Sequence, residues 1–145
     1  MYIFDTREQK NDHIKKWFDK HGIAYRTEKL DCGDYMIDGG SLTIDRKQNL
    51  DELAKNLLNP QDKQRFIREC KRAMETGVKI IVLCEHGKGV KSLPDIRGWK
   101  SKYSPVTGKA LLDAIYRVCV SYGVQFVFCD RRQTARKIIE ILKSA

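Results

Sequence analysis

The segment from Lys79 to Glu85 has the sequence KIIVLCE and is an almost continuous apolar run. Such a run is typical of a central strand that is covered on both faces of a layered sheet. Strand-like runs alternate with stretches of helical periodicity along the rest of the chain. Other strands are predicted at 2–5, 24–30 and 124–128, and helices at 11–21, 50–58, 61–76, 107–122 and 134–142. This alternation predicts an α/β fold in which a mixed central β-sheet is flanked by helices.

A β-hairpin is predicted between Asp34 and Lys47. Its strands run from Asp34 to Ile37 and from Ser41 to Lys47, with two consecutive glycines supplying the turn. The segment 86–105 is polar and contains several Gly and Pro residues, so it is predicted to be an irregular loop. Because the chain has 145 residues, no linker and no internal repeat, we expect a single domain that spans 1–145.

The charge balance of the chain is strongly basic. Lys and Arg number 28 against 19 Asp and Glu, which gives a formal net charge of +9. At this chain length such an excess favours a polyanionic partner, most often a nucleic acid. No apolar run reaches the roughly 20 residues of a membrane span, and the N-terminus lacks a signal-peptide pattern. Five cysteines without a C-x-x-C pair do not indicate a disulfide framework. We therefore expect a cytoplasmic protein that does not contact a membrane.

The second strand of the predicted hairpin carries the most informative polar residues. Side chains alternate along a strand, so Asp45 and Lys47 share one face, about 7 Å apart, while Arg46 points to the other face. Asp34 lies at the start of the partner strand. Two carboxylates suit Mg²⁺, and a neighbouring lysine can orient or deprotonate an attacking water. An isolated D-x-K also occurs on ordinary solvated strands, so this pattern alone leaves both interpretations open.

Three separated sequence blocks strengthen the catalytic interpretation. They are Asp5-x-Arg7-Glu8, Gly33-Asp34-Tyr35 and Asp45-Arg46-Lys47-x-x-x-Asp51. In this order and spacing they resemble the nuclease domain of XPF-family structure-selective DNA endonucleases, whose hallmark is a GD…ERK-x-x-x-D pattern. That family belongs to the PD-(D/E)XK superfamily, so the resemblance implies a restriction-endonuclease-like core. The resemblance is strongest over residues 1–75 and extends to the C-terminus.

The resemblance also implies a role for each matching residue. Asp34 and Asp45 would hold the metal together with the backbone carbonyl of Arg46, and Asp5 would contribute a ligand directly or through water. Lys47 would position the attacking water. Supporting roles, in contacting phosphate or orienting the ligands, fall to the remaining motif residues, which are Arg7, Glu8, Arg46 and Asp51.

Two features depart from the family pattern. Asp45 stands where the family usually has Glu, which keeps the carboxylate but shortens it by one methylene. We also expect the chain to lack the tandem helix-hairpin-helix module that binds branched DNA in archaeal and eukaryotic relatives. We therefore expect a stand-alone nuclease domain of bacterial or phage type, in a bacterial cell or a phage-infected host.

Several basic and aromatic residues are candidate DNA contacts. They are Arg7, Arg46, Arg65, Lys88, Lys91, Trp99, Lys100 and Lys102. The loop around Lys88 and Lys91 is either a contact to the DNA backbone or a plain surface loop. Trp99 either stacks on a base or anchors its own loop to the body of the protein. The segment 86–92 lacks the G-x-x-x-x-G-K-[ST] spacing, so no nucleotide cofactor is expected.

These observations favour a Mg²⁺- or Mn²⁺-dependent DNA endonuclease acting on branched or forked DNA in repair or recombination. Two alternatives stay open at this point. One is a catalytically inactive DNA-binding or scaffold protein on the same fold, and the other is a basic RNA-binding domain. The RNA-binding alternative predicts salt-sensitive binding without a metal requirement. Apolar faces on the last two helices also allow a homodimer through the nuclease domain.

Overall fold

Six strands form one sheet in the order β2-β1-β3-β4-β5-β6. The computed structural model describes residues 1–86 and 89–144. The strands are β1 (Tyr2–Asp5), β2 (Tyr25–Glu28), β3 (Tyr35–Ile37), β4 (Leu42–Lys47), β5 (Lys79–Glu85) and β6 (Gln125–Cys129). The β2–β1, β4–β5 and β5–β6 pairs are parallel, whereas β3 runs antiparallel to both β1 and β4. The predicted mixed sheet is therefore confirmed.

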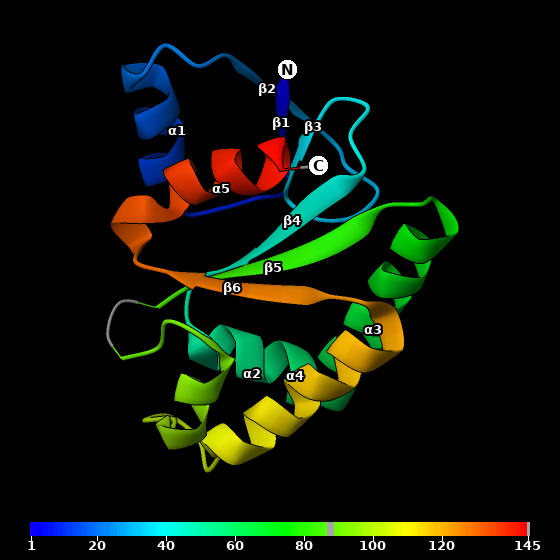
Figure 1. Ribbon diagram of the computed structural model, residues 1–145, viewed down its shortest axis with the longest axis vertical. Helices are drawn as coiled ribbons and strands as arrows, with labels where there is room; N and C mark the ends of the chain where they lie inside the picture. The colour runs from blue at the N-terminus through cyan, green and yellow to red at the C-terminus, as the bar shows by residue number, and fades with distance from the viewer. Residues whose placement is uncertain (87–88, 145) are drawn as a thin grey trace.

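Helices cover both faces of this sheet (Figure 1). The helices are α1 (Asp12–Lys20), α2 (Leu50–Leu58), α3 (Pro60–Glu75), α4 (Gly108–Tyr122) and α5 (Thr134–Lys143). Figure 1 shows α1 and α5 above the sheet and α2, α3 and α4 below it. Within the part of the chain that the structure describes, no helix is both long and apolar enough to cross a bilayer.

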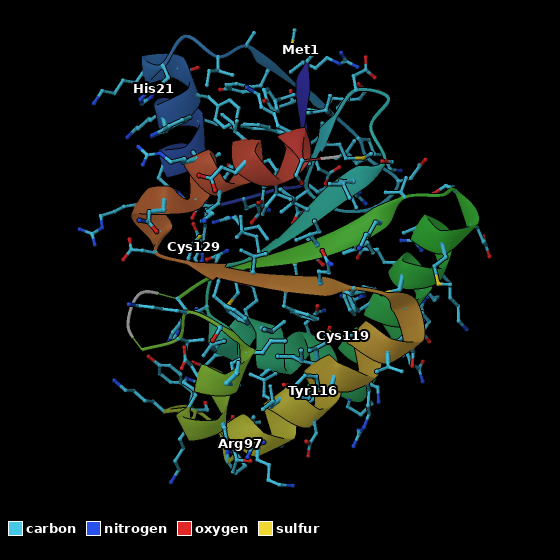
Figure 2. All side chains as sticks on the ribbon, in the orientation of Figure 1. Met1, His21, Arg97, Tyr116, Cys119 and Cys129 are labelled. Carbon is cyan, nitrogen blue, oxygen red and sulfur yellow. The ribbon has the colours of Figure 1, made fainter. Side chains whose placement is uncertain are left out.

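Strand β5 is buried along both of its faces, as its apolar sequence predicts. Val82 and Cys84 pack with α2, α3 and α4, while Leu83 packs with α1 and α5. Figure 2 shows side chains filling the spaces above and below the sheet. The two hydrophobic clusters therefore hold β4, which pairs with β5 in parallel, between two layers of helices.

Local sequence signals explain where the helices begin and end. The side chains of Asn49, Asn59 and Thr107 accept hydrogen bonds from the first-turn amides of α2, α3 and α4. These caps satisfy backbone donors that have no partner inside the helix. Helix α4 ends at Tyr122 and is capped by Gly123, whose φ of 67° is the left-handed conformation that favours glycine.

The segment predicted as an irregular loop contains a short 3₁₀ helix, η1 (Leu93–Gly98). Its Ile96 is fully buried in the cluster below the sheet. Gly108, at the start of α4, lies so close to the carbonyl of Ile96 that a Cβ there would overlap it. The polar sequence of the segment concealed this packing, because Val90 and Ile96 are isolated apolar residues within it, and both are buried in that cluster.

Candidate active site

The hairpin of β3 and β4 places the predicted catalytic residues around one pocket. Asp34, just before β3, lies beside Asp45 and Lys47 of β4 in a pocket of about 460 Å³. The described pocket lining also contains an asparagine, acidic residues and three arginines, namely Asn56, Asp5, Asp31, Glu69, Arg7, Arg65 and Arg72. The structure thus brings the predicted acids and the predicted lysine together from separate parts of the chain.

Asp34 is held rigidly by the backbone of β4. Its amide donates to the carbonyl of Ile44 at 2.7 Å, and its Oδ2 accepts from the backbone N–H of Arg46 at 2.8 Å. Burial, and then the charge of Asp45, raise the pKa of Asp34 well above its usual value. Two carboxylates crowded into a buried pocket repel each other, and a bound cation would relieve that repulsion.

Lys47 lines the same pocket and pairs with Asp45. Its Nζ is 3.2 Å from Oδ1 of Asp45, and both side chains are largely buried. Burial lowers the pKa of Lys47, but the negative charges of Asp45 and Asp34 outweigh that effect and leave the pKa above its usual value. Lys47 therefore remains an ammonium at neutral pH, which suits it to donate hydrogen bonds and not to accept a proton.

Asp5 reaches the same pocket from the end of β1. Its Oδ1 accepts from the backbone N–H of Leu30 at 2.8 Å, and its Oδ2 pairs with Nε of Arg7 at 3.0 Å. Arg7 keeps most of its side chain in solvent and also donates to the carbonyl of Leu30. Asp5 is thus a buried acid whose oxygens are already partnered, and Arg7 is an accessible cation at the pocket's edge.

Glu69 of α3 also lines this pocket, although the sequence analysis did not predict it as a site residue. Its Oε1 accepts from the backbone N–H of Gly33 at 2.9 Å. Burial, and then the charge of Asp45, raise the pKa of Glu69 to about 7. A signal was present in the sequence, because Glu69 lies three residues after Phe66 and four before Ala73 on the buried side of the helix.

Arg46 occupies the opposite face of β4, as strand alternation predicts. Its Nε lies 2.8 Å from Glu8 and its Nη1 lies 2.5 Å from Glu85, and only 1% of its side chain is exposed. The prediction that this side chain contacts DNA is therefore wrong, because it is buried and fully engaged. Glu85 is equally buried and also contacts His13 and Thr134, so it is neither a simple strand-end charge nor part of the pocket.

The ERCC4 domain model matches residues 4–142. The chain belongs to the ERCC4 domain family. Its fold is similar to XPF from Aeropyrum pernix, with a TM-score of 0.71 and 20% sequence identity over 100% of this chain and 66% of that chain. A structure of XPF from Aeropyrum pernix in complex with DNA matches with a TM-score of 0.70 and 20% identity, over 99% of this chain and 63% of that chain. A search of curated proteins found no match.

The comparisons confirm the family resemblance and show an XPF-like fold. The chain spans about two thirds of the length of the two solved XPF chains. At 20% identity the structural likeness concerns the fold, so the function of individual residues rests on the geometry of this site.

Other ERCC4 motif residues and candidate DNA contacts lie elsewhere. Asp51 is on α2, where it accepts from Ser101 Oγ at 2.5 Å and fixes the segment that precedes α4. It does not line the pocket, so a role in orienting the metal ligands does not fit its position. Trp99 is half-buried against the lower cluster, which fits the anchoring alternative. Lys88 lies outside the described residues.

The other basic candidates divide into two groups. Arg65 and Arg7 are exposed at the pocket, and Arg72, which is not among the DNA contacts predicted from the sequence, lies there too. Lys91, Lys100 and Lys102 are exposed but do not line the pocket. A phosphate that enters this ERCC4 pocket therefore meets arginines at its rim and carboxylates at its base.

The residues of the pocket fit a divalent cation of the Mg²⁺ type. Asp34 and Asp45 supply hard oxygen donors, and the buried amide oxygen of Asn56, on the same pocket wall, has no partner among the described residues. In residues 1–86 and 89–144, no group of three or more His, Cys, Asp or Glu side chains is arranged to hold a metal ion by itself. Mg²⁺ commonly uses one or two carboxylates and completes its shell with waters and substrate phosphate.

Proposed function

We propose that this chain is a Mg²⁺- or Mn²⁺-dependent endodeoxyribonuclease that hydrolyses phosphodiester bonds in branched or forked DNA. The observation that carries the proposal is the convergence of Asp34, Asp45 and Lys47 on one pocket. The arginines at the rim of that pocket support a polyanionic substrate, as does the net charge of +9. Membership of the ERCC4 domain family favours DNA over RNA as that substrate.

The proposed division of labour follows from the position of each side chain. Asp34 and Asp45 would hold the cation, with Asp5 contributing through water and the Arg46 carbonyl as a further ligand. A bound divalent cation would supply positive charge at the scissile phosphate and a water of lowered pKa. The ammonium of Lys47 would donate to the attacking water and offset charge on the phosphate.

The rim arginines would hold the DNA backbone beside the cut. Arg7 keeps 61% of its side chain exposed and Arg65 keeps 72%, so both are accessible to phosphate. Arginine binds phosphate through two parallel hydrogen bonds, which fixes orientation as well as position. This arrangement favours a substrate whose backbone passes over the pocket and not a small phosphate ester.

A homodimer remains part of the proposal. Tyr116 and Val120 lie one helical turn apart on α4, with 45% and 86% of each residue exposed. Figure 2 labels Tyr116 on this helix. Sedimentation of the purified protein measures the oligomeric state directly.

The cytoplasmic location and the role in repair or recombination stay predictions.

The proposed activity is tested with labelled DNA of defined shape. Purified protein is incubated with flap, fork, four-way junction, linear duplex and single-stranded DNA, each with Mg²⁺, with Mn²⁺ and with a chelator. The proposal predicts cleavage that requires a divalent ion and is fastest on a branched substrate. Binding of branched DNA without cleavage under any of these conditions would instead support a catalytically inactive scaffold on the same fold.

A further inference from the structure

Glu69 connects helix α3 to the backbone that carries Asp34. Its Oε1 accepts from the N–H of Gly33 at 2.9 Å, and Gly33 immediately precedes Asp34. Most of the other charged side chains of α3 are exposed, whereas Glu69 is half-buried and lines the pocket together with the buried Phe66. Burying a charge costs free energy unless the charge makes a specific interaction. The position of the Glu69 carboxylate therefore indicates that its contact with Gly33 is important.

The segment before Asp34 is also clamped from the sheet. Oγ1 of Thr43 donates to the carbonyl of Cys32 at 2.9 Å. Gly33 has a φ of +76°, and a Cβ at Gly33 would overlap the Thr43 hydroxyl. The backbone therefore passes through a narrow, left-handed turn between β4 and α3. Thr43 fixes one side of that turn and Glu69 fixes the other.

We propose that Glu69 is a positioning residue, which holds Gly33 and thereby sets the orientation in which Asp34 presents its carboxylate to the metal. The inference rests on the proposed function, since it assigns Asp34 to the cation. Partners that orient a metal ligand through a hydrogen bond typically change metal affinity or activity by about 10- to 100-fold when removed.

The contact geometry favours positioning over direct ligation by Glu69. One oxygen is already committed to the Gly33 amide, and the charge of Asp45 opposes a further negative charge nearby. A neutral acceptor of the same shape would keep the hydrogen bond to Gly33. Glutamine therefore replaces the function of Glu69 under this proposal, whereas alanine removes it.

The test compares Glu69→Gln, Glu69→Ala and a control variant, Glu75→Ala, which alters an exposed acid on the same helix. Hydrogen exchange of the Gly33 and Asp34 amides is measured by NMR without metal. Mn²⁺ affinity is measured by electron paramagnetic resonance without DNA. We expect Glu69→Ala to lose at least about tenfold in both amide protection and Mn²⁺ affinity. Glu69→Gln and Glu75→Ala should stay within about threefold of wild type.

Two results would overturn the inference. One is Glu69→Ala with wild-type amide protection and Mn²⁺ affinity, which would make the contact to Gly33 unimportant. The other is Glu69→Gln as impaired as Glu69→Ala, which would mean that the charge itself is required. Failure of the proposed function is distinguishable, because it appears in the wild type as absent Mn²⁺ binding and absent DNA cleavage.

Discussion

The backbone N–H of Arg46 donates to Oδ2 of Asp34 at 2.8 Å, and so joins β4 to the acid that precedes β3. The side chain of Arg46 lies on the opposite face of β4, where it pairs with Glu8 and Glu85. Arg46 therefore links the pocket on one face of β4 with a buried ionic network on the other. Stability and function are coupled at this point, and substitutions on the two faces should have opposite consequences.

Substitution of Asp34 should separate stability from activity. Asp34→Asn removes a carboxyl whose pKa is raised by burial and by the charge of Asp45, so the metal-free protein should become more stable at pH 8. Cleavage should fall at least about a hundredfold, because a proposed metal ligand is lost. Calorimetry and the cleavage assay measure the two effects, with the exposed Asp38→Asn as the control. A strongly destabilised Asp34→Asn would contradict the account.

Substitution of Arg46 should act in the other direction. Arg46→Met leaves Glu8 and Glu85 buried without their cation, which should cost about 3–5 kcal/mol of unfolding free energy. Denaturant unfolding measures this loss. Arg26→Met is the control, because Arg26 pairs with Glu28 at 2.9 Å on the exposed edge of the sheet and should change stability by less than about 1 kcal/mol. Equal losses of unfolding free energy in the two variants would show that the buried ion pairs of Arg46 contribute no more to stability than the exposed pair of Arg26.

Lys47 should matter for the chemical step and not for binding. Lys47→Met should reduce the single-turnover cleavage rate at least about a hundredfold, because it removes the ammonium beside Asp45. DNA affinity, measured by fluorescence anisotropy, should stay within about twofold of wild type. The exposed Lys79→Met on β5 serves as the control. Loss of DNA affinity as large as the loss of rate would place Lys47 among the binding residues instead.

The free energy of unfolding should depend on pH through the titration of Glu69. Its pKa rises from 4.5 to about 7 on folding, so the folded state binds this proton more tightly than the unfolded state. The resulting stabilisation is complete below pH 4.5 and is lost as the pH rises to about 7. Relative to wild type, metal-free Glu69→Gln should gain on the order of 2 kcal/mol between these two pH values. Parallel stability curves for the two proteins would refute this assignment.

Substitution of Arg72 tests whether DNA binds at the rim of the pocket. Arg72→Ala should weaken binding to every DNA substrate and lower the slope of log affinity against log salt by about one. Arg136→Ala, on the opposite face of the sheet, is the matched control and should leave the slope unchanged. If Lys102→Ala reduced the slope and Arg72→Ala did not, the DNA path would follow the segment before α4 and not the pocket.

Much of this architecture was predictable from sequence because the informative patterns were local. The apolar run at 79–85 and the alternation at 42–47 specified two adjacent strands and the face on which Asp45 and Lys47 lie. Long-range partners were not predictable in the same way. Glu69 approaches Gly33 across 36 positions, and Asp51 bonds Ser101 across 50, and neither pairing has a local signature. The motif position of Asp51 suggested a site role that its hydrogen bond does not support.

The central claim is that Asp34, Asp45 and Lys47 form a metal-dependent centre for DNA hydrolysis. The most direct measurement is the single-turnover cleavage of a forked DNA by wild type and by Asp45→Asn, with Mg²⁺ and with a chelator. The account predicts cleavage by wild type only with Mg²⁺, and a rate at least about a hundredfold lower for Asp45→Asn with DNA affinity retained. Wild-type cleavage that persists in chelator, or Asp45→Asn that cuts at the wild-type rate, would contradict it.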